Sequence, residues 1–366
     1  MEQQISIRGR TARKMIKMAN HMPIIGHKAQ SGEIRAKLSE RERLWECPGH
    51  LEVSFIDMNL FGMELLRNRK VDTQDIQNNT EIEETETSLE EAESTGMDNA
   101  GIDVYISEGE TFNADKVSDN ESKLYGDNKG IILQLHGGGY YGRMHNTYRD
   151  MAALYNEISN GYDVLSVDYR VAPDNPYPAA LEDAVTAYEW ILDNGYSSDR
   201  IFVAGDSAGG GLTLALCLYL RDHDMQMPAG IVTMSAWTDL TKSGESYHEN
   251  FNIDPMFGGS TDTLVYKDGY YREDDPENPY ISPVNGDYTG FPPMLMQVGE
   301  YEMLLSDTLT VAENAKKAGV MVKSHVYPGM FHVFQMGLTR YPEAKEAWVE
   351  VGKFIRYIIK SKDTII

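Results

Sequence analysis

A serine at position 207 is surrounded by the small residues that a nucleophile requires. Residues 205–209 read Gly-Asp-Ser-Ala-Gly, which has the form G-x-S-x-G. Such a pattern fits a sharp strand-to-helix turn that exposes the serine hydroxyl and places a helix N-terminus behind it. The pattern also occurs by chance, but here an apolar run at 201–204 precedes it and an apolar helix is predicted at 212–221. We therefore predict that Ser207 is a nucleophile rather than part of an ordinary turn.

Three consecutive glycines follow another apolar run. Residues 136–139 read His-Gly-Gly-Gly and come directly after residues 131–135, which predict a buried strand. Without side chains in the way, the N–H groups of Gly138 and Gly139 can point at a bound oxygen, and with the N–H of Ala208 they would form an oxyanion hole. A phosphate-binding loop is the alternative, but it would need Lys and Ser or Thr after the glycines, where this chain has two tyrosines.

A serine nucleophile needs a base, and the sequence offers nine histidines. His332 lies in a late loop after the strand predicted at 322–327, where the chain order of nucleophile, acid and base would place it. His325 lies within that strand and is interpreted as structural. The remaining histidines are interpreted as surface residues or precede the predicted core, so we predict His332 as the base.

The acid that orients the base should follow the strand predicted at 294–298. Glu300, Glu302 and Asp307 all lie there, and their spacing alone does not choose among them. Asp307 has a second interpretation, as an acidic residue at a helix N-terminus that the helix dipole stabilises.

Strands and helices alternate in the part of the chain that carries these residues. Apolar runs predict strands at 51–58, 131–135, 164–169, 201–204, 231–235, 294–298 and 322–327, with a short one at 102–107. Helical spacing predicts helices at 181–194, 212–221, 306–318 and 341–360. This alternation is typical of an α/β fold with βαβ crossovers and a mostly parallel central sheet flanked by helices.

Taken together, these motifs resemble the bacterial hormone-sensitive-lipase-like family of carboxylesterases, within the α/β hydrolases. The matching stretches follow the family's order and cover nearly all of residues 129–350: HGGGYY at 136–141, DYRVAPDNPYPAALEDA at 168–184, GDSAGGG at 205–211, SAWTDLTKSGES at 235–246, NPYISPV at 278–284 and GMFHVF at 329–334. The resemblance implies a catalytic α/β hydrolase domain over 129–366. It also implies a helical cap formed by the N-terminal segment, residues 1–50, and by residues 240–285.

The resemblance also selects the acid. Many members carry an aspartate in an Asp-Pro-Leu motif, whereas a subgroup carries a glutamate in a Glu-x-Leu-Leu motif, which residues 302–305 resemble. Glu302 is therefore assigned as the acid, and Asp307 is kept as the alternative.

Several further residues match family positions or lie beside the motifs. His136, Gly137, Tyr169 and Asp206 are expected to hold the glycine loop and the turn at Ser207 rather than to take part in the chemistry. Four aromatic residues have two open interpretations, as lining of the substrate pocket or as plain core residues: Tyr140, Tyr141, Trp237 and Tyr301.

The resemblance implies a serine esterase that hydrolyses short acyl esters of small molecules through an acyl-enzyme, and no metal or organic cofactor is expected. A carbohydrate deacetylase and a long-chain lipase share this mechanism and are alternatives. A ligand-binding receptor on the same fold is an alternative of another class, which the presence of Ser207, His332 and a carboxylate disfavours. Because relatives often dimerise through a sheet edge, a homodimer is a further expectation.

Charge is distributed unevenly along the 366 residues. The formal net charge is −24, and residues 72–128 hold 17 acidic side chains against only 2 basic ones. This negative net charge disfavours nucleic acid as a partner, and it disfavours stable association with an anionic membrane. Residues 51–128 are interpreted as leading strands with an acidic, mobile insertion at about 72–100. An interaction arm for a basic partner is the alternative for this segment.

Two further predictions concern the N-terminal segment and the location of the protein. Residues 5–20 are basic with interspersed Ile and Met, and we expect a helix that packs on its own protein rather than one lying on a membrane surface. Two cysteines cannot form a disulfide framework, and no apolar signal-peptide core or membrane span is visible. A cytoplasmic location is therefore expected.

Overall fold

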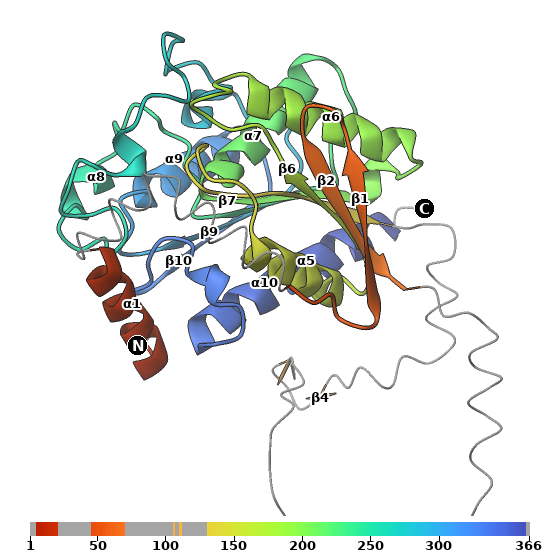
Figure 1. The fold of residues 1–366 in the computed structure, drawn as a ribbon, viewed down its shortest axis with the longest axis horizontal. Helices are drawn as coiled ribbons and strands as arrows, with labels where there is room; N and C mark the ends of the chain where they lie inside the picture. Colours follow the sequence, from red (N-terminus) through yellow and green to blue (C-terminus); the bar gives the residue numbers. More distant parts are fainter. Residues whose placement is uncertain (1–4, 21–44, 70–104, 107–109, 112–129, 364–366) are drawn as a thin grey trace, which may run out of the picture.

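A computed structural model describes residues 5–20, 45–69, 105–106, 110–111 and 130–363 (Figure 1). The predicted acidic insertion at about 72–100 lies outside the described residues. The main element is an eight-stranded sheet with the order β1-β2-β6-β5-β7-β8-β9-β10. Its strands are β1 (Leu51–Asp57), β2 (Gly62–Asn68), β5 (Ile131–Leu135), β6 (Asp163–Asp168), β7 (Ile201–Asp206), β8 (Gly230–Met234), β9 (Met294–Gly299) and β10 (Val322–Tyr327). A separate two-stranded pair joins β3 (Tyr105–Ile106) and β4 (Glu110–Thr111).

The sheet is parallel from β6 to β10, and β1 and β2 add an antiparallel edge. The longer helices among the described residues are α1 (Ile7–Asn20), α5 (Asn146–Ile158), α6 (Ala179–Asp193), α7 (Ser207–Asp222), α9 (Leu305–Lys317) and α10 (Pro342–Asp363). Every residue of β5, β7, β8 and β9 is buried, because helices cover both faces of the parallel strands. These features confirm the predicted α/β hydrolase class of fold.

Alternate side chains of β5 and β7 enter two separate cores. On one face Leu133 and Val203 pack in the core that includes α6 and α7. On the other face Ile132 and Phe202 pack with α5 and α10. Figure 1 shows these two helix layers above and below the sheet. Burial of this apolar surface is the main term that stabilises the fold.

Most predicted elements are found within a few residues of their expected bounds, but the strand β2 and the helix α5 were not predicted. The strand β2 is a short run with a buried acid, Glu64, and the helix α5 begins only seven residues after the glycine loop. Residues 240–285 contain only short helices: α8 (Ser246–Glu249), η4 (Leu264–Tyr266) and η5 (Pro283–Asn285). The prolines, glycines and aspartates of this segment favour turns over long helices.

Parallel pairing brings the carboxyl ends of the strands to one edge of the sheet. Leu135, the last residue of β5, pairs with Gly205 in β7, so the glycine loop and Ser207 emerge side by side. Tyr327, the last residue of β10, pairs with Gly299 at the end of β9, so the loops that carry the predicted acid and base are also neighbours.

The helix α7 starts unusually close to β5. A Cβ at Gly209 would lie 2.1 Å from the carbonyl oxygen of Leu135 and 2.4 Å from that of His136. Both neighbours are backbone atoms, which cannot move aside without disturbing the sheet or the glycine loop. Glycine is therefore required at this position by space rather than by backbone dihedral.

We predict that Gly209→Ala lowers the free energy of unfolding by about 2–3 kcal/mol, because the new methyl group overpacks this contact. Urea titration followed by fluorescence measures the change. Gly62→Ala is the matched control, since a Cβ there would meet nothing within 4 Å. Equal unfolding midpoints for the two variants would contradict this account of the contact.

A polar cluster anchors β10 to α10. The Glu350 carboxylate accepts hydrogen bonds from Lys323 Nζ at 2.8 Å, Gln297 Nε2 at 2.9 Å and the Tyr327 hydroxyl at 2.9 Å, and His325 Nδ1 lies 3.2 Å away. Burial alone would raise the pKa of Glu350, but the hydrogen bonds from His325, Lys323 and Gln297 outweigh it and lower the pKa to about 2.

A carboxyl group whose pKa is lower in the folded state stabilises the fold above its unfolded pKa and loses that effect as the pH falls. Between pH 5 and pH 3 the wild type should therefore lose about 1 kcal/mol more unfolding free energy than Glu350→Gln, after allowance for solvent screening. Urea titrations at the two pH values test this. Identical acid sensitivity of the two proteins would show that Glu350 carries no such stabilisation.

Candidate active site

The turn at Ser207 has the geometry of a strained nucleophile. Ser207 follows β7 directly and begins α7, with φ at +52°, a left-handed value that non-glycine residues seldom adopt. Its carbonyl accepts a hydrogen bond from Trp237 N at 2.8 Å, which helps to hold the turn. The strain is compatible with the fold because packing on both sides of the turn fixes the backbone.

The structure brings Ser207, His332 and Glu302 into one hydrogen-bonded chain. The Ser207 hydroxyl donates to His332 Nε2 at 2.9 Å, and His332 Nδ1 donates to Glu302 Oε2 at 2.9 Å. All three side chains are buried or nearly so. In this order the imidazole can take the proton of the serine while the carboxylate holds the ring and stabilises its positive charge.

The second oxygen of Glu302 is fixed as firmly as the first. Oε1 accepts hydrogen bonds from Ser235 Oγ at 2.7 Å and from the Gly299 N–H at 2.5 Å. The same Ser235 oxygen accepts the N–H of Val333 at 3.0 Å, directly after His332. Ser235 therefore links the acid to the backbone beside the base.

Asp307, the alternative acid, has a different environment. It lies in the first turn of α9, and its Oδ2 accepts the backbone N–H groups of Thr238 and Asp239, each at 2.8 Å. Burial and the nearby Asp239 raise the pKa of Asp307. The carboxylate thus braces the loop after β8, and the described hydrogen bonds of His332 run to Glu302 and Ser207.

The glycine loop approaches Ser207 from β5. Gly138 and Gly139 have φ values of +109° and +63°, and both line the same cavity as Ser207. A Cβ at Gly137 would lie only 2.3 Å from Asp206 Oδ2, so this glycine too is required by space. Ala208 lies in the first turn of α7, where N–H groups have no acceptor within the helix.

Asp206 and an unpredicted tyrosine secure the base of this loop. The Gly137 N–H donates to the Tyr148 hydroxyl at 2.9 Å and to Asp206 Oδ1 at 3.1 Å, and the Tyr148 hydroxyl donates to Asp206 Oδ2 at 3.3 Å. Burial raises the pKa of Asp206 to about 7, while positive charge on His332 acts to lower it. Protonation of Asp206 is therefore coupled to the charge of the imidazole.

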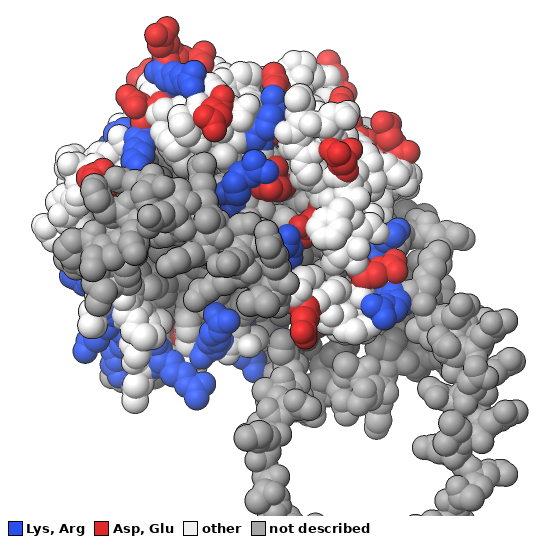
Figure 2. Space-filling view, in the orientation of Figure 1, with Lys and Arg blue, Asp and Glu red and all other residues white. Residues whose placement is uncertain are grey.

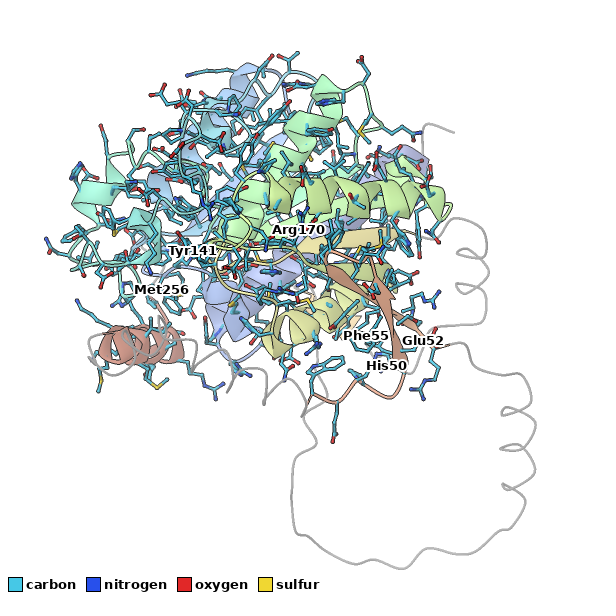
Figure 3. All side chains as sticks on the ribbon, turned by 45° about the horizontal axis from the view of Figure 1, so that its top comes forward. His50, Glu52, Phe55, Tyr141, Arg170 and Met256 are labelled. Atoms are coloured by element: carbon cyan, nitrogen blue, oxygen red, sulfur yellow. The ribbon has the colours of Figure 1, made fainter. Side chains whose placement is uncertain are left out.

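His136 and Tyr169 hold the loop from the other side. Their rings stack with centroids 4.0 Å apart, and the Tyr169 hydroxyl donates to the His136 carbonyl at 2.5 Å. Burial lowers the pKa of His136 to about 4, so its imidazole is neutral at pH 7. Arg170, labelled in Figure 3, pairs with Asp183 at 2.7 Å and thereby ties the end of β6 to α6.

A cavity of about 700 Å³ opens over Ser207. Its wall combines α1, the glycine loop, the segment around Met256 and the region between β10 and α10. In Figure 3 Met256 lies close to α1, and both border the cavity. The lining is mostly apolar and consists of Arg8, Thr11, Ala12, Met15, Ile16, Gly138, Gly139, His145, Tyr148, Asp206, Ser207, Met256, Phe257, Phe331, His332, Val333, Met336, Gly337, Arg340 and Tyr341.

The four aromatic residues considered for the pocket are not among the residues that line this cavity. Tyr140 stacks on Tyr270 with centroids 3.7 Å apart, and Trp237 is buried in the core that includes α6 and α7. Because both rings fill the interior, they match the alternative interpretation as core aromatics.

Tyr141 and Tyr301 are placed differently but also away from the cavity. Lys267 Nζ lies 5.8 Å from the centre of the Tyr141 ring, and the Arg13 guanidinium lies 4.6 Å from that of Tyr301. The Tyr301 ring therefore helps to seat α1 on the catalytic core. The aromatic wall of the cavity is supplied instead by Tyr148, Phe257, Phe331 and Tyr341.

The residues that sequence reasoning missed lie on segments without a motif of their own. Tyr148 belongs to α5, which was not predicted. Phe257 lies on an irregular segment, and the centroid of its ring is 4.6 Å from that of the His332 ring. A weak sequence signal could have indicated Ser235, because it follows β8 directly at the edge of the sheet where the other site residues emerge.

Neither a metal site nor a membrane span is found in the described ranges. No group of three His, Cys, Asp or Glu side chains there could hold a metal ion. No helix of these ranges is sufficiently long and apolar to cross a membrane.

Comparisons with known proteins agree with this geometry. Residues 132–336 match a family model described as an alpha/beta hydrolase fold. An acetyl-hydrolase of Streptomyces hygroscopicus is 37% identical over 225 residues, which are 62% of this chain and 75% of that protein. An esterase of Acinetobacter venetianus is 36% identical over 228 residues, which are 61% of this chain and 74% of that protein.

Similarity to solved structures extends over more of the chain. The crystal structure of an esterase from the bacterial hormone-sensitive lipase family matches with a TM-score of 0.73 at 27% identity. The match covers 98% of this chain and 100% of that one. The sequence motifs, the fold and the relatives therefore agree that this chain belongs to the hormone-sensitive-lipase-like carboxylesterases of the α/β hydrolase fold.

Proposed function

We propose that this esterase hydrolyses short acyl esters by a serine mechanism with an acyl-enzyme intermediate. The observation that carries the proposal is the buried chain of two 2.9 Å hydrogen bonds from Ser207 through His332 to Glu302. A receptor that only binds its ligand would not need this arrangement. The proposal also covers the oxyanion hole, formed by the N–H groups of Gly138, Gly139 and Ala208.

In the first half of the reaction the Ser207 oxygen attacks the ester carbonyl while His332 takes its proton. Negative charge on the carbonyl oxygen is stabilised by the three N–H groups. The tetrahedral intermediate then collapses, the bond to the alcohol oxygen breaks, and the imidazolium gives its proton to the departing alcohol. Glu302 keeps the ring in one orientation and stabilises its charged form.

In the second half a water molecule replaces the alcohol. His332 takes a proton from the water as its oxygen attacks the acyl carbon of the acyl-enzyme. Collapse of the second tetrahedral intermediate breaks the bond to the Ser207 oxygen, which recovers its proton from His332, and the free acid is released.

The proposed preference for acyl groups from acetyl to about hexanoyl has two supports. One is the similarity to a protein named acetyl-hydrolase. The other is the size of the cavity, about 700 Å³, which must hold both the acyl and the alcohol parts. Carbohydrate deacetylation and lipase activity remain alternatives of the same mechanism, and a chain-length series of acyl esters beside acetylated sugars separates them. A homodimer and a cytoplasmic location also stay predictions.

Ser207→Ala should lower kcat for p-nitrophenyl butyrate by about 10⁴-fold or more, because no other group supplies the attacking oxygen. Release of p-nitrophenol measures the rate. Ser235→Ala, which removes a hydroxyl near the site but not the nucleophile, should retain more activity than Ser207→Ala. Activity of Ser207→Ala close to that of the wild type would refute the mechanism.

Exchange of each candidate acid for its amide tests the assignment of Glu302. Glu302→Gln should lower kcat by about 10³- to 10⁴-fold, because the amide no longer stabilises the imidazolium or its productive tautomer. Asp307→Asn should change kcat by less than about fivefold, since its neighbours are backbone N–H groups. Thermal unfolding of both variants checks that they are folded. The opposite pattern of kcat would transfer the role to Asp307.

A further inference from the structure

Two guanidinium groups border a cavity that is otherwise mostly apolar. Arg8 comes from α1 and Arg340 from the segment just before α10, so elements from the two ends of the chain contribute them to the lining of one cavity. Both side chains are exposed to solvent at the cavity. In Figure 2 Lys and Arg side chains gather at the lower left of the visible face, where α1 lies in Figure 1.

Among the described residues that line the cavity, no exposed acidic side chain accompanies these two cations. Among the lining residues of the described chain Asp206 is the one carboxylate, and it is buried beneath Ser207 with Gly137 N and the Tyr148 hydroxyl as partners. The salt bridges of the described ranges include neither Arg8 nor Arg340. The nearest acid in sequence to Arg340, Glu343, is engaged by the N–H and hydroxyl of Ser6 at 2.6 and 2.8 Å.

His145 also lines the cavity and adds little positive charge to it. Burial and the neighbouring Arg149 lower the pKa of His145, which favours its neutral form. The cavity thus presents two positive charges to a substrate, on a protein whose formal net charge is −24. At physiological ionic strength charges act over roughly 8 Å, so guanidinium groups that line the cavity can act on a bound ester.

We infer that the preferred substrates are esters that carry an anionic group, such as a carboxylate, on the part that lies toward Arg8 and Arg340. This inference rests on the proposed esterase function and names its substrate class. The apolar wall would hold the carbon chain, and the two guanidinium groups would bind the carboxylate through charge-assisted hydrogen bonds. Both arginines are specificity determinants in this account and take no part in bond breaking.

The test compares mono-(p-nitrophenyl) glutarate, which is anionic, with p-nitrophenyl butyrate, which is neutral. For Arg8→Gln/Arg340→Gln, the ratio of kcat/KM for the anionic ester to that for the neutral one should fall about five- to tenfold. Arg8→Lys/Arg340→Lys, which keeps the charges, should retain most of the ratio. Arg10→Gln is the matched control on α1, exposed but not on the cavity wall. An unchanged ratio in the glutamine variant, or an equal fall in Arg10→Gln, would overturn the inference.

Binding without turnover keeps this test independent of the catalytic mechanism. In the Ser207→Ala background, calorimetry should show that mono-(p-nitrophenyl) glutarate binds about five- to tenfold more weakly when both arginines are replaced by glutamine. The loss should shrink at high salt, since the pairs are exposed. Equal affinities with and without the arginines would refute the anionic preference. Absence of hydrolysis of either ester by the wild type would refute the proposed function instead.

Discussion

The parallel pairing of β5, β7, β8, β9 and β10 is the constraint on which the candidate site depends. It brings five carboxyl ends to one edge, so loops that are up to about 200 residues apart in sequence meet there. The contact between Gly209 and the end of β5 sets the distance between the turn at Ser207 and the glycine loop. Apolar burial on both faces of the sheet provides the rigidity that three buried polar side chains need.

Burial also affects the acidic side chains at this edge of the sheet. Glu302 is fully buried, yet both of its oxygens have hydrogen-bond donors, which offset the cost of removing a carboxylate from water. Burial raises the pKa of Asp206 to about 7, although the Gly137 N–H and the Tyr148 hydroxyl donate hydrogen bonds to it.

Sequence patterns predicted the fold, and the structure brings the predicted nucleophile, base and acid together. The turn at Ser207, the glycine loop and His332 carry local patterns that follow apolar strands, and those strands lie where the patterns place them. Glu302 could be separated from Asp307 only through the family resemblance, because both are acids after the same strand. Their environments differ through tertiary contacts, with Ser235 in one case and the loop after β8 in the other.

The cavity wall could not be predicted in the same way. Tyr140 and Trp237 adjoin the motifs but point into the core, whereas Phe257 and Tyr148 come from segments without a motif. Side-chain direction on irregular segments depends on packing between distant parts of the chain, which local spacing does not encode. Arg8 and Arg340 line one cavity for the same reason, since they come from α1 and from the segment before α10.

The most direct test of the central claim is covalent labelling of the native enzyme with a fluorophosphonate, followed by intact-mass measurement and peptide mapping. This reagent reacts with an activated serine hydroxyl and mimics the tetrahedral intermediate. We predict one adduct per chain, on the peptide that contains Ser207. The adduct should form much more slowly in Glu302→Gln than in the wild type. A protein that stays unlabelled, or an adduct on another serine, would contradict it.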